Sequence, residues 1–356
     1  MVSWKCINFI NLLFFFKIDT IIFRFTFNSE HRFKNIIMGI NMDNYFLIQL
    51  PSLIIDDVLD FNLYLKSGSE YVLYRSSLLK FGIENKQKLL ENEIYDLYVP
   101  GEDLSKYHKY IEQNIKNFLQ DETIEENTKA AIVYDSVKLA IKDLFKNPTS
   151  KVNIKRSQTL VDSVIFFIFQ GRNPITNLMD VMSFDYTTYT HSINVAILSI
   201  SLGNHMGIKN AQSLVELGTG ALLHDIGKTK ISNEILEKKT PLNDSEIKLI
   251  REHPQIGYDL LKETGLLSEQ ILIPVLQHHE RNDGSGYPNK LKADEIHLHS
   301  KIVGIADVFD AMTTNKIYRP AHNAFPALQE MFGEESHFDL ELLQNFTKML
   351  GQKKED

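Results

Sequence analysis

Two polar residues continue the apolar stripe of one predicted helix in this sequence. The predicted helix Ser213–Asp225 has an apolar stripe through Leu217 and Ala221. His224 and Asp225, seven and eight residues after Leu217, lie on that same face. A buried carboxylate is strongly destabilising unless a charge or a metal ion neutralises it. The pattern predicts either a metal site or a core histidine beside a capping aspartate.

The same pattern recurs in other predicted helices. His191 shares a helical face with the apolar Val195. The predicted helix Ser300–Thr313 is apolar on both sides, which is typical of a buried helix, and it carries Asp307 and Asp310 inward. Buried polar side chains therefore come from several separate segments.

The remaining histidines lie near predicted helix boundaries. His253 directly precedes Pro254, and His278 and His279 are consecutive. The candidate metal ligands are His191, His224, Asp225, His253, His278, His279 and Asp307.

Imidazole and carboxylate donors without sulfur suit divalent iron, manganese, zinc or nickel. Because the chain has 1 cysteine, Cys6, a thiolate zinc site is excluded. Seven ligands are too many for one tetrahedral ion but suit two ions that share a bridging carboxylate. Two ions about 3.5–4 Å apart activate a water and clamp a phosphoryl group, so the sequence predicts metal-assisted phosphoester hydrolysis.

Cations and a glycine-rich loop accompany these residues. The cations near the candidate ligands in sequence are Lys228, Arg281, Lys316 and Arg319. In a chain of net charge −8 they favour an anionic substrate, although solvated surface charges would look the same. Tyr287, in the loop Asp283–Pro288, could stack on a base or belong to an ordinary surface turn.

Length and composition limit the class of protein. At 356 residues the chain is long enough for two domains, and 43% hydrophobic with 24% charged residues is typical of a globular protein. A protein that coats a nucleic acid polymer needs a basic face, so the net charge of −8 disfavours that class. A single cysteine excludes a disulfide within one chain.

The predicted fold class is mainly α: an all-helical bundle preceded by a small α+β domain. Strands are predicted at 61–66, 71–75 and 94–99 and a short helix at 78–93. Thr123–Lys146 begins the helical part. We predict a regulatory α+β domain at 42–120 and a helical domain with its connector helix at 121–350.

Residues 1–41 are ambiguous. An apolar run, Cys6–Phe16, is interrupted by Lys17 and Asp19 before it reaches the length of a membrane span. A membrane anchor, a signal peptide and a translation start at Met38 or Met42 are the three alternatives. We expect a cytoplasmic protein, with membrane contact left open.

Three motifs resemble those of the HD-GYP family of cyclic di-GMP phosphodiesterases, within the HD-domain phosphohydrolases. They are His224-Asp-Ile-Gly-Lys228, His278-His-Glu-Arg-Asn-Asp-Gly-Ser-Gly-Tyr-Pro288 and Asp307-Val-Phe-Asp-Ala-Met-Thr-Thr313. The resemblance covers about residues 185–321, and its long central motif is the most specific part. It implies a helical HD domain that hydrolyses cyclic di-GMP to linear pGpG, and in some members on to GMP, through a metal-bridged water.

The resemblance also implies a role for each matching residue. His191, His224, Asp225 and Asp307 would surround one metal ion, and Asp225 would bridge to a second ion held by His253, His278 and His279. The catalytic residues would be Asp225 and Lys228, with Lys228 on the scissile phosphate. Lys316 and Arg319 would bind phosphate, and Tyr287 would line the guanine pocket. Arg281 is a further substrate-binding candidate on its charge alone. Iron or manganese is the expected metal, with zinc or nickel as alternatives.

The sequence departs from the family pattern at two positions. Thr187 stands where some members carry a glutamate that holds a third metal, so we expect a two-metal site. Asn315-Lys316 replaces an acidic residue and an arginine, so a bidentate contact to phosphate is lost.

Two other functions stay open beside a cyclic di-GMP phosphodiesterase. One is a receptor or adaptor that binds the dinucleotide and hydrolyses little. The other is an HD hydrolase of another cyclic dinucleotide. The resemblance is also compatible with protein partners such as a diguanylate cyclase and with an oligomer.

Overall fold

The computed structural model describes residues 44–182, 187–314 and 324–351. A small antiparallel sheet forms the first part of this chain. Its strands, in the order β1-β6-β3-β4, are β1 (Tyr45–Gln49), β6 (Asp96–Pro100), β3 (Leu63–Ser67) and β4 (Glu70–Arg75). β2 (Asp57–Val58) and β5 (Lys80–Phe81) pair separately, and helix α1 (Ile83–Glu91) follows β5.

The sheet confirms most of the predicted strands and corrects the first helix. β3 and β4 pair through a tight turn in which Gly68 has a φ of 62°. The helix predicted at 78–93 spans only Ile83–Glu91, because Leu78 has a φ of 65° and Lys80–Phe81 pairs with β2. Left-handed backbone at Leu78 is incompatible with a helix that begins there.

Helices make up the rest of the described chain. They are α2 (Leu104–Gln120), α3 (Glu126–Lys146), α4 (Lys151–Gln170), α5 (Pro174–Val181), α6 (Thr188–His205), α7 (Ala211–Leu223), α8 (Asn233–Leu236), α9 (Asp244–Ile250), α10 (His253–Lys262), α11 (Glu269–Gln277), α12 (Leu298–Thr313), α13 (Ala324–Gly333) and α14 (Leu340–Leu350). The protein is therefore mainly helical with a small N-terminal sheet, as the sequence predicts.

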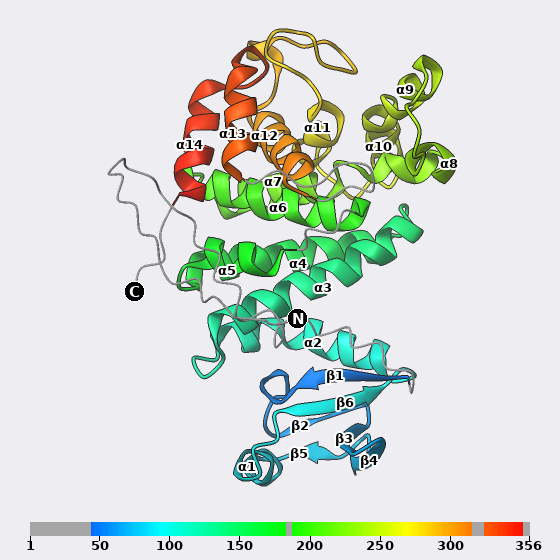
Figure 1. Cartoon of the computed structure of the whole chain (residues 1–356), viewed down its shortest axis with the longest axis vertical. Helices are drawn as coiled ribbons and strands as arrows, with labels where there is room; N and C mark the ends of the chain where they lie inside the picture. Colours follow the sequence, from blue (N-terminus) through cyan, green and yellow to red (C-terminus); the bar gives the residue numbers. More distant parts are fainter. Residues whose placement is uncertain (1–43, 183–186, 315–323, 352–356) are drawn as a thin grey trace, which may run out of the picture.

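The helices are arranged in layers between the sheet and the C-terminal helices α13 and α14 (Figure 1). α2 packs against β6 and α3, α3 packs against α4 and α6, and α6 packs against α7 and α12. Near the sheet, the rings of Phe61 and Tyr107 meet edge to face with centroids 5.5 Å apart. α3 thus lies between the sheet-bearing part and the C-terminal helices.

α6 is the most deeply buried helix near the predicted site. Every residue from Thr190 to Gly203 is buried, including His191 and Asn194. A helix buried on all sides belongs to the centre of a bundle, and its polar side chains must find partners there. Within the described ranges, no helix has both the length and the apolar character needed to cross a membrane.

The first prediction concerns Asp135, a half-buried carboxyl group on α3. Burial raises the pKa of Asp135 from 3.8 to about 6, although Lys138 opposes the rise. Between these two pKa values the folded state holds a proton that the unfolded state has lost, so stability falls as the pH rises. Asp135→Asn should therefore raise the free energy of unfolding by about 1–2 kcal/mol at pH 7.5.

Chemical denaturation across a pH series measures this effect. The gain should shrink steadily below pH ~6 and vanish near pH ~3, where both states hold the proton. Asp162→Asn, on the neighbouring α4, serves as a comparison because burial also raises the pKa of this group. A gain in Asp135→Asn that is the same at pH ~4 and pH ~7.5 would contradict the prediction.

Candidate metal centre

The seven predicted ligands reach one region from five separate segments. His191 lies in the first turns of α6, and Asp307 lies in α12. His224 is the C-cap of α7, and Asp225 is the N-cap of the 3₁₀ turn η2 (Ile226–Lys230). The helix predicted to run through Asp225 therefore ends at Leu223.

Gly227 explains how the η2 turn meets α10. A Cβ atom at Gly227 would overlap the carbonyl oxygen of His253 and lie 2.7 Å from the backbone nitrogen of Gly257. Only glycine allows such a close approach of two backbones. Gly227 is therefore a contact point that brings His253 beside Asp225.

The first ligand cluster contains His191, His224 and Asp225. The Oδ2 atom of Asp225 lies 3.5 Å from His224 Nε2 and 3.9 Å from His191 Nε2. Asp307 Oδ1 lies 2.9 Å from His191 Nε2 and 3.9 Å from His224 Nε2. Four donor atoms thus surround one point, all on buried residues.

The second cluster contains His253, His278 and His279. The Nε2 atoms of His253 and His278 lie 3.1 Å apart. Asp225 Oδ1 lies 3.2 Å from His253 Nε2, so the two oxygens of Asp225 face the two clusters. Asp307 also reaches this cluster, because its Oδ2 atom lies 3.6 Å from His279 Nδ1.

Hydrogen bonds fix the protonation of four of the imidazoles. The Nδ1 atoms of His224 and His253 lie 2.7 Å from the carbonyl oxygens of Ala221 and Ile250. The Nδ1 atoms of His191 and His278 lie 2.7 Å from Asp310 Oδ2 and 2.9 Å from the Val275 carbonyl, respectively. Because each acceptor requires a proton on Nδ1, each neutral ring turns the lone pair of Nε2 inward.

Inward lone pairs on neighbouring rings repel one another unless a cation lies between them. His224 Nε2 and Asp225 Oδ1 are two of the buried side-chain atoms of the described residues that have no hydrogen-bond partner. Unsatisfied buried polar atoms are rare in folded proteins. A metal ion would satisfy both atoms, so the donor set fits metal binding.

The charges of the carboxylates and imidazoles also suit metal binding. Burial alone would raise the pKa of Asp225, but Lys228 holds it well below its usual value. Burial lowers the pKa of His278 far below its usual value. The carboxylate is therefore charged and the imidazole neutral, which are the forms that bind metals.

Lys228 and Tyr287 lie beside the two clusters. The Nζ atom of Lys228 donates to Asp225 Oδ2 at 2.6 Å, and its side chain is 17% exposed. The ring centroid of Tyr287 is 4.6 Å from that of His279, with an angle of 31° between the planes. Arg251 lies over the Tyr287 ring at 5.4 Å, a cation that the sequence did not single out.

Glu280 holds the loop that carries Tyr287. This buried carboxylate accepts hydrogen bonds from the backbone nitrogens of Asn289 (2.7 Å) and Leu291 (2.9 Å). Gly286 packs so closely that a Cβ atom there would lie 2.5 Å from the His279 carbonyl oxygen. The loop is therefore tied to the segment that carries His278 and His279.

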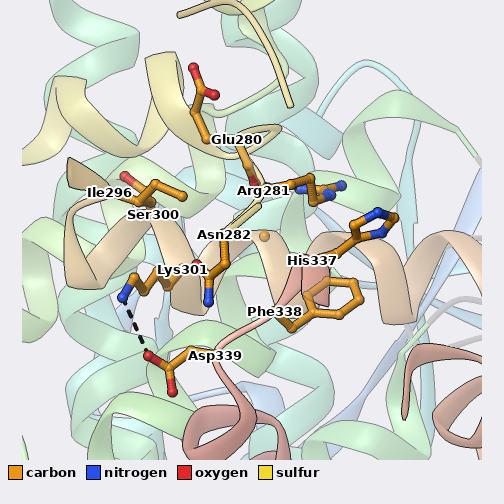
Figure 2. Close-up of a pocket in the computed structure, with 10 residues that line it drawn as sticks. Glu280, Arg281, Asn282, Ile296, Ser300, Lys301, His337, Phe338 and Asp339 are labelled. Atoms are coloured by element: carbon orange, nitrogen blue, oxygen red, sulfur yellow. Dashed lines mark hydrogen bonds and ion pairs between the residues drawn. The ribbon is translucent and has the colours of Figure 1, made fainter. Parts of the chain in front are cut away.

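Arg281 lies behind this segment, in a small pocket with Phe338 and His337 (Figure 2). Its Nη1 atom donates to the carbonyl oxygens of His278 (3.1 Å) and Glu280 (2.9 Å). Its guanidinium group lies 5.7 Å from the centroid of the Phe338 ring. Arg281 thus differs from Lys228, because its donors already serve the backbone of the ligand segment.

Of the other positions that the sequence singled out, the structure describes Thr187 but not Lys316 or Arg319. Thr187 caps α6, since its side chain accepts the backbone N–H of Thr190 at 3.2 Å. Lys316 and Arg319, like residues 1–41, lie outside the described residues. Thr187 is therefore engaged in the fold of α6.

Comparison with known proteins identifies the domain. Residues 178–342 match the model of the HD domain family. The chain is 32% identical over 229 residues to a cyclic di-GMP phosphodiesterase of Pseudomonas aeruginosa, covering 64% of this chain and 55% of the relative. It is 38% identical over 154 residues to a cyclic di-GMP phosphodiesterase of Borreliella burgdorferi, covering 43% and 40%.

Residues 178–342 thus match the HD domain, and the chain is related to the HD-GYP phosphodiesterases. A 3'3'-cGAMP-specific phosphodiesterase of Vibrio cholerae is also similar, with 34% identity over 134 residues, 38% of this chain and 29% of the relative. The chain thus spans about half the length of these curated relatives, or less.

The fold is also similar to that of a solved structure. The HDG"Y"P protein Bd1817 from Bdellovibrio bacteriovorus matches with a TM-score of 0.63 over 86% of this chain and 100% of its own, at 22% identity. In this HD domain, the two buried His/Asp clusters are consistent with a binuclear metal site.

The second prediction is that metal binding stabilises the fold. An ion that binds only the folded state at 100 times its dissociation constant adds about 2.7 kcal/mol to the free energy of unfolding. Mn²⁺ added to the chelated protein should therefore raise the unfolding temperature measured by calorimetry. Unfolding temperatures that are identical with chelator and with Mn²⁺, Fe²⁺, Zn²⁺ or Ni²⁺ would contradict a metal site.

The third prediction concerns the Gly227 contact. Gly227→Ala should separate η2 from α10, destabilise the protein by about 1–3 kcal/mol and weaken Mn²⁺ binding at least tenfold. Gly333→Ala is the matched control, because nothing lies within 4 Å of its added Cβ atom. Calorimetry and metal titration test both variants, and normal Mn²⁺ affinity in Gly227→Ala would contradict the role of this contact.

Proposed function

We propose that this protein is a metal-dependent phosphodiesterase that hydrolyses cyclic di-GMP to linear pGpG. One observation carries the proposal: the two oxygens of Asp225 face two separate ligand clusters, and Lys228 pairs with the same carboxylate. A carboxylate between two metal positions with a cation beside it suits a phosphodiester substrate. The relatives named as cyclic di-GMP phosphodiesterases support this choice of dinucleotide.

Seven residues would hold two divalent ions in this proposal: His191, His224, Asp225 and Asp307 for one ion, and His253, His278 and His279 for the other, with Asp225 shared. Iron and manganese suit this mixture of imidazole and carboxylate, as do zinc and nickel. Such ions supply Lewis acidity at the phosphate and lower the pKa of a bound water.

Lys228 is the proposed electrostatic catalyst. Its ammonium group lies 2.6 Å from Asp225 Oδ2 and its side chain is partly exposed, so it can reach a phosphate at the mouth of the centre. A cation there would stabilise the negative charge that develops on the phosphoryl oxygens and on the leaving oxygen.

Tyr287 is the proposed wall of the guanine pocket. Burial raises the pKa of Tyr287, so the ring stays neutral and can pack on a base. Phosphate contacts from Lys316 and Arg319 stay predictions. Because Nη1 of Arg281 bonds the carbonyls of His278 and Glu280, a phosphate contact from Arg281 would come from its other guanidinium nitrogens.

A second candidate substrate is 3'3'-cGAMP. The relative of Vibrio cholerae with 34% identity is named as specific for this dinucleotide. Both substrates carry two phosphodiester bonds and differ in one base, so the proposed metal centre would serve either. Discrimination between them would depend on the base pocket near Tyr287.

The fourth prediction tests hydrolysis directly. Purified full-length protein with Mn²⁺ or Fe²⁺ should convert cyclic di-GMP to pGpG, measured by chromatography, with cyclic GMP-AMP and cyclic di-AMP in parallel. His224→Ala and Asp225→Asn should lower kcat at least 10³-fold, since each removes a ligand. Lys228→Met should lower kcat about 10²–10³-fold, in the range found when an electrostatic donor is removed.

Lys238→Met is the matched control for Lys228→Met. Lys238 forms an ion pair with Glu246 at 2.7 Å, away from the seven ligands, so its loss should leave turnover unchanged. Full activity in Asp225→Asn would contradict the mechanism. Tight binding of cyclic di-GMP without product under every metal would instead favour the receptor or adaptor hypothesis.

The protein's place in a signalling system is a further part of this proposal. We propose that the sheet-bearing part, about 42–120, is a regulatory domain for the helical part, about 121–350. A cytoplasmic location, an oligomer and partners such as a diguanylate cyclase stay predictions.

A further inference from the structure

A series of buried hydrogen bonds lies behind His191, outside the two ligand clusters. Tyr134 on α3 donates its hydroxyl proton to Asn194 Oδ1 at 3.1 Å. Asn194 Nδ2 donates to Asp310 Oδ1 at 2.9 Å, and Asp310 Oδ2 accepts from His191 Nδ1 at 2.7 Å. None of these four side chains is more than 3% exposed.

These hydrogen bonds allow one consistent assignment of donors and acceptors. The Asn194 oxygen accepts from Tyr134, so its amide nitrogen must point to Asp310. Asp310 in turn receives an amide proton and an imidazole proton. A carboxylate that accepts the Nδ1 proton of a metal-binding histidine fixes the orientation of the ring. It also makes Nε2 a stronger electron-pair donor to the metal.

Tyr134 connects this series of hydrogen bonds to a helix that carries none of the seven candidate ligands. α3 packs against α6, which holds His191 and Asn194, and also against α2, which packs on the sheet. In Figure 1, α3 lies between the sheet and the C-terminal helices. The hydroxyl of Tyr134 is therefore a direct polar link from α3 to the candidate metal centre.

We propose that Asp310 is a positioning residue for His191, and that Asn194 and Tyr134 extend this positioning to α3. Displacement of α3 would then change the affinity of the first cluster for its metal ion. The inference rests on the proposed function for any effect on turnover, but metal affinity tests it without a substrate.

The fifth prediction is that substitutions which break this series of hydrogen bonds weaken metal binding. The full-length protein, freed of metal by a chelator, is titrated with Mn²⁺ and free Mn²⁺ is measured by electron paramagnetic resonance. Asp310→Asn should weaken one of two Mn²⁺ sites 10–100-fold, which is typical for loss of an outer partner of a ligand. Tyr134→Phe, which removes one hydroxyl group, should weaken the same site about three- to tenfold.

Tyr107→Phe is the matched control. It also removes one hydroxyl from a buried tyrosine, but that hydroxyl donates to Ser52 Oγ at 2.8 Å, next to the sheet. Its Mn²⁺ affinity should equal that of the unmodified protein. In a hydrolysis assay, kcat of Tyr134→Phe should fall at limiting Mn²⁺ and recover at saturating Mn²⁺, a rescue that a purely structural defect would not give.

The outcomes separate the two proposals. Equal Mn²⁺ affinity in Tyr134→Phe, Tyr107→Phe and the unmodified protein would overturn the link to α3, even if Asp310→Asn does not fold. Weakened Mn²⁺ binding in Tyr134→Phe would support the link. If the unmodified protein binds Mn²⁺ but hydrolyses no cyclic dinucleotide, the proposed function fails while the result of the metal titration stands.

Discussion

The helical part of this protein depends on one constraint. Several lone pairs of imidazoles and carboxylates point at one another in a region that is closed to water. Four imidazoles are held by acceptors at Nδ1, so their Nε2 atoms point at one another and at two carboxylates. In a medium of low polarity this arrangement is unfavourable without positive charge at its centre. Lys228 supplies one such charge, but it reaches only one oxygen of Asp225.

The surrounding fold can be understood as the means of holding these groups against their mutual repulsion. α6 is buried on every side, which prevents rotation of His191 toward solvent. The close backbone contact at Gly227 fixes the distance between η2 and α10. The backbone of α6 and the backbone contact at Gly227 hold the two clusters in place. Their separation is one that the two oxygens of the Asp225 carboxylate can bridge.

The sequence indicated the candidate ligands because polar residues continued apolar stripes. The stripe that ended in His224 and Asp225 indicated the first cluster, and the position of Asp307 in a doubly apolar helix indicated its fourth donor. The helical class and the small sheet were also predictable, since the hydrophobic period changes from 2 to 3.6 along the chain.

Contacts between distant segments could not be read from local patterns. Nothing near Gly227 indicates that the backbone of α10 touches it, because that contact joins residues about 30 positions apart. Glu280 directly follows two histidines in the sequence, and no local pattern shows that it binds two backbone N–H groups. Asp310 was visible as a buried carboxylate, but its partners His191 and Asn194 belong to a helix more than 100 residues earlier.

The attachment of the Tyr287 loop to the ligand segment limits how this protein can change its substrate preference. Glu280 and the close packing of Gly286 join the proposed base-contacting ring to His278 and His279 as one unit. If Tyr287 lines a base pocket as proposed, a substitution that reshapes this wall for another purine would also move two imidazoles. A change of base preference would then be coupled to metal binding, unless it came from another segment such as the one that carries Arg251.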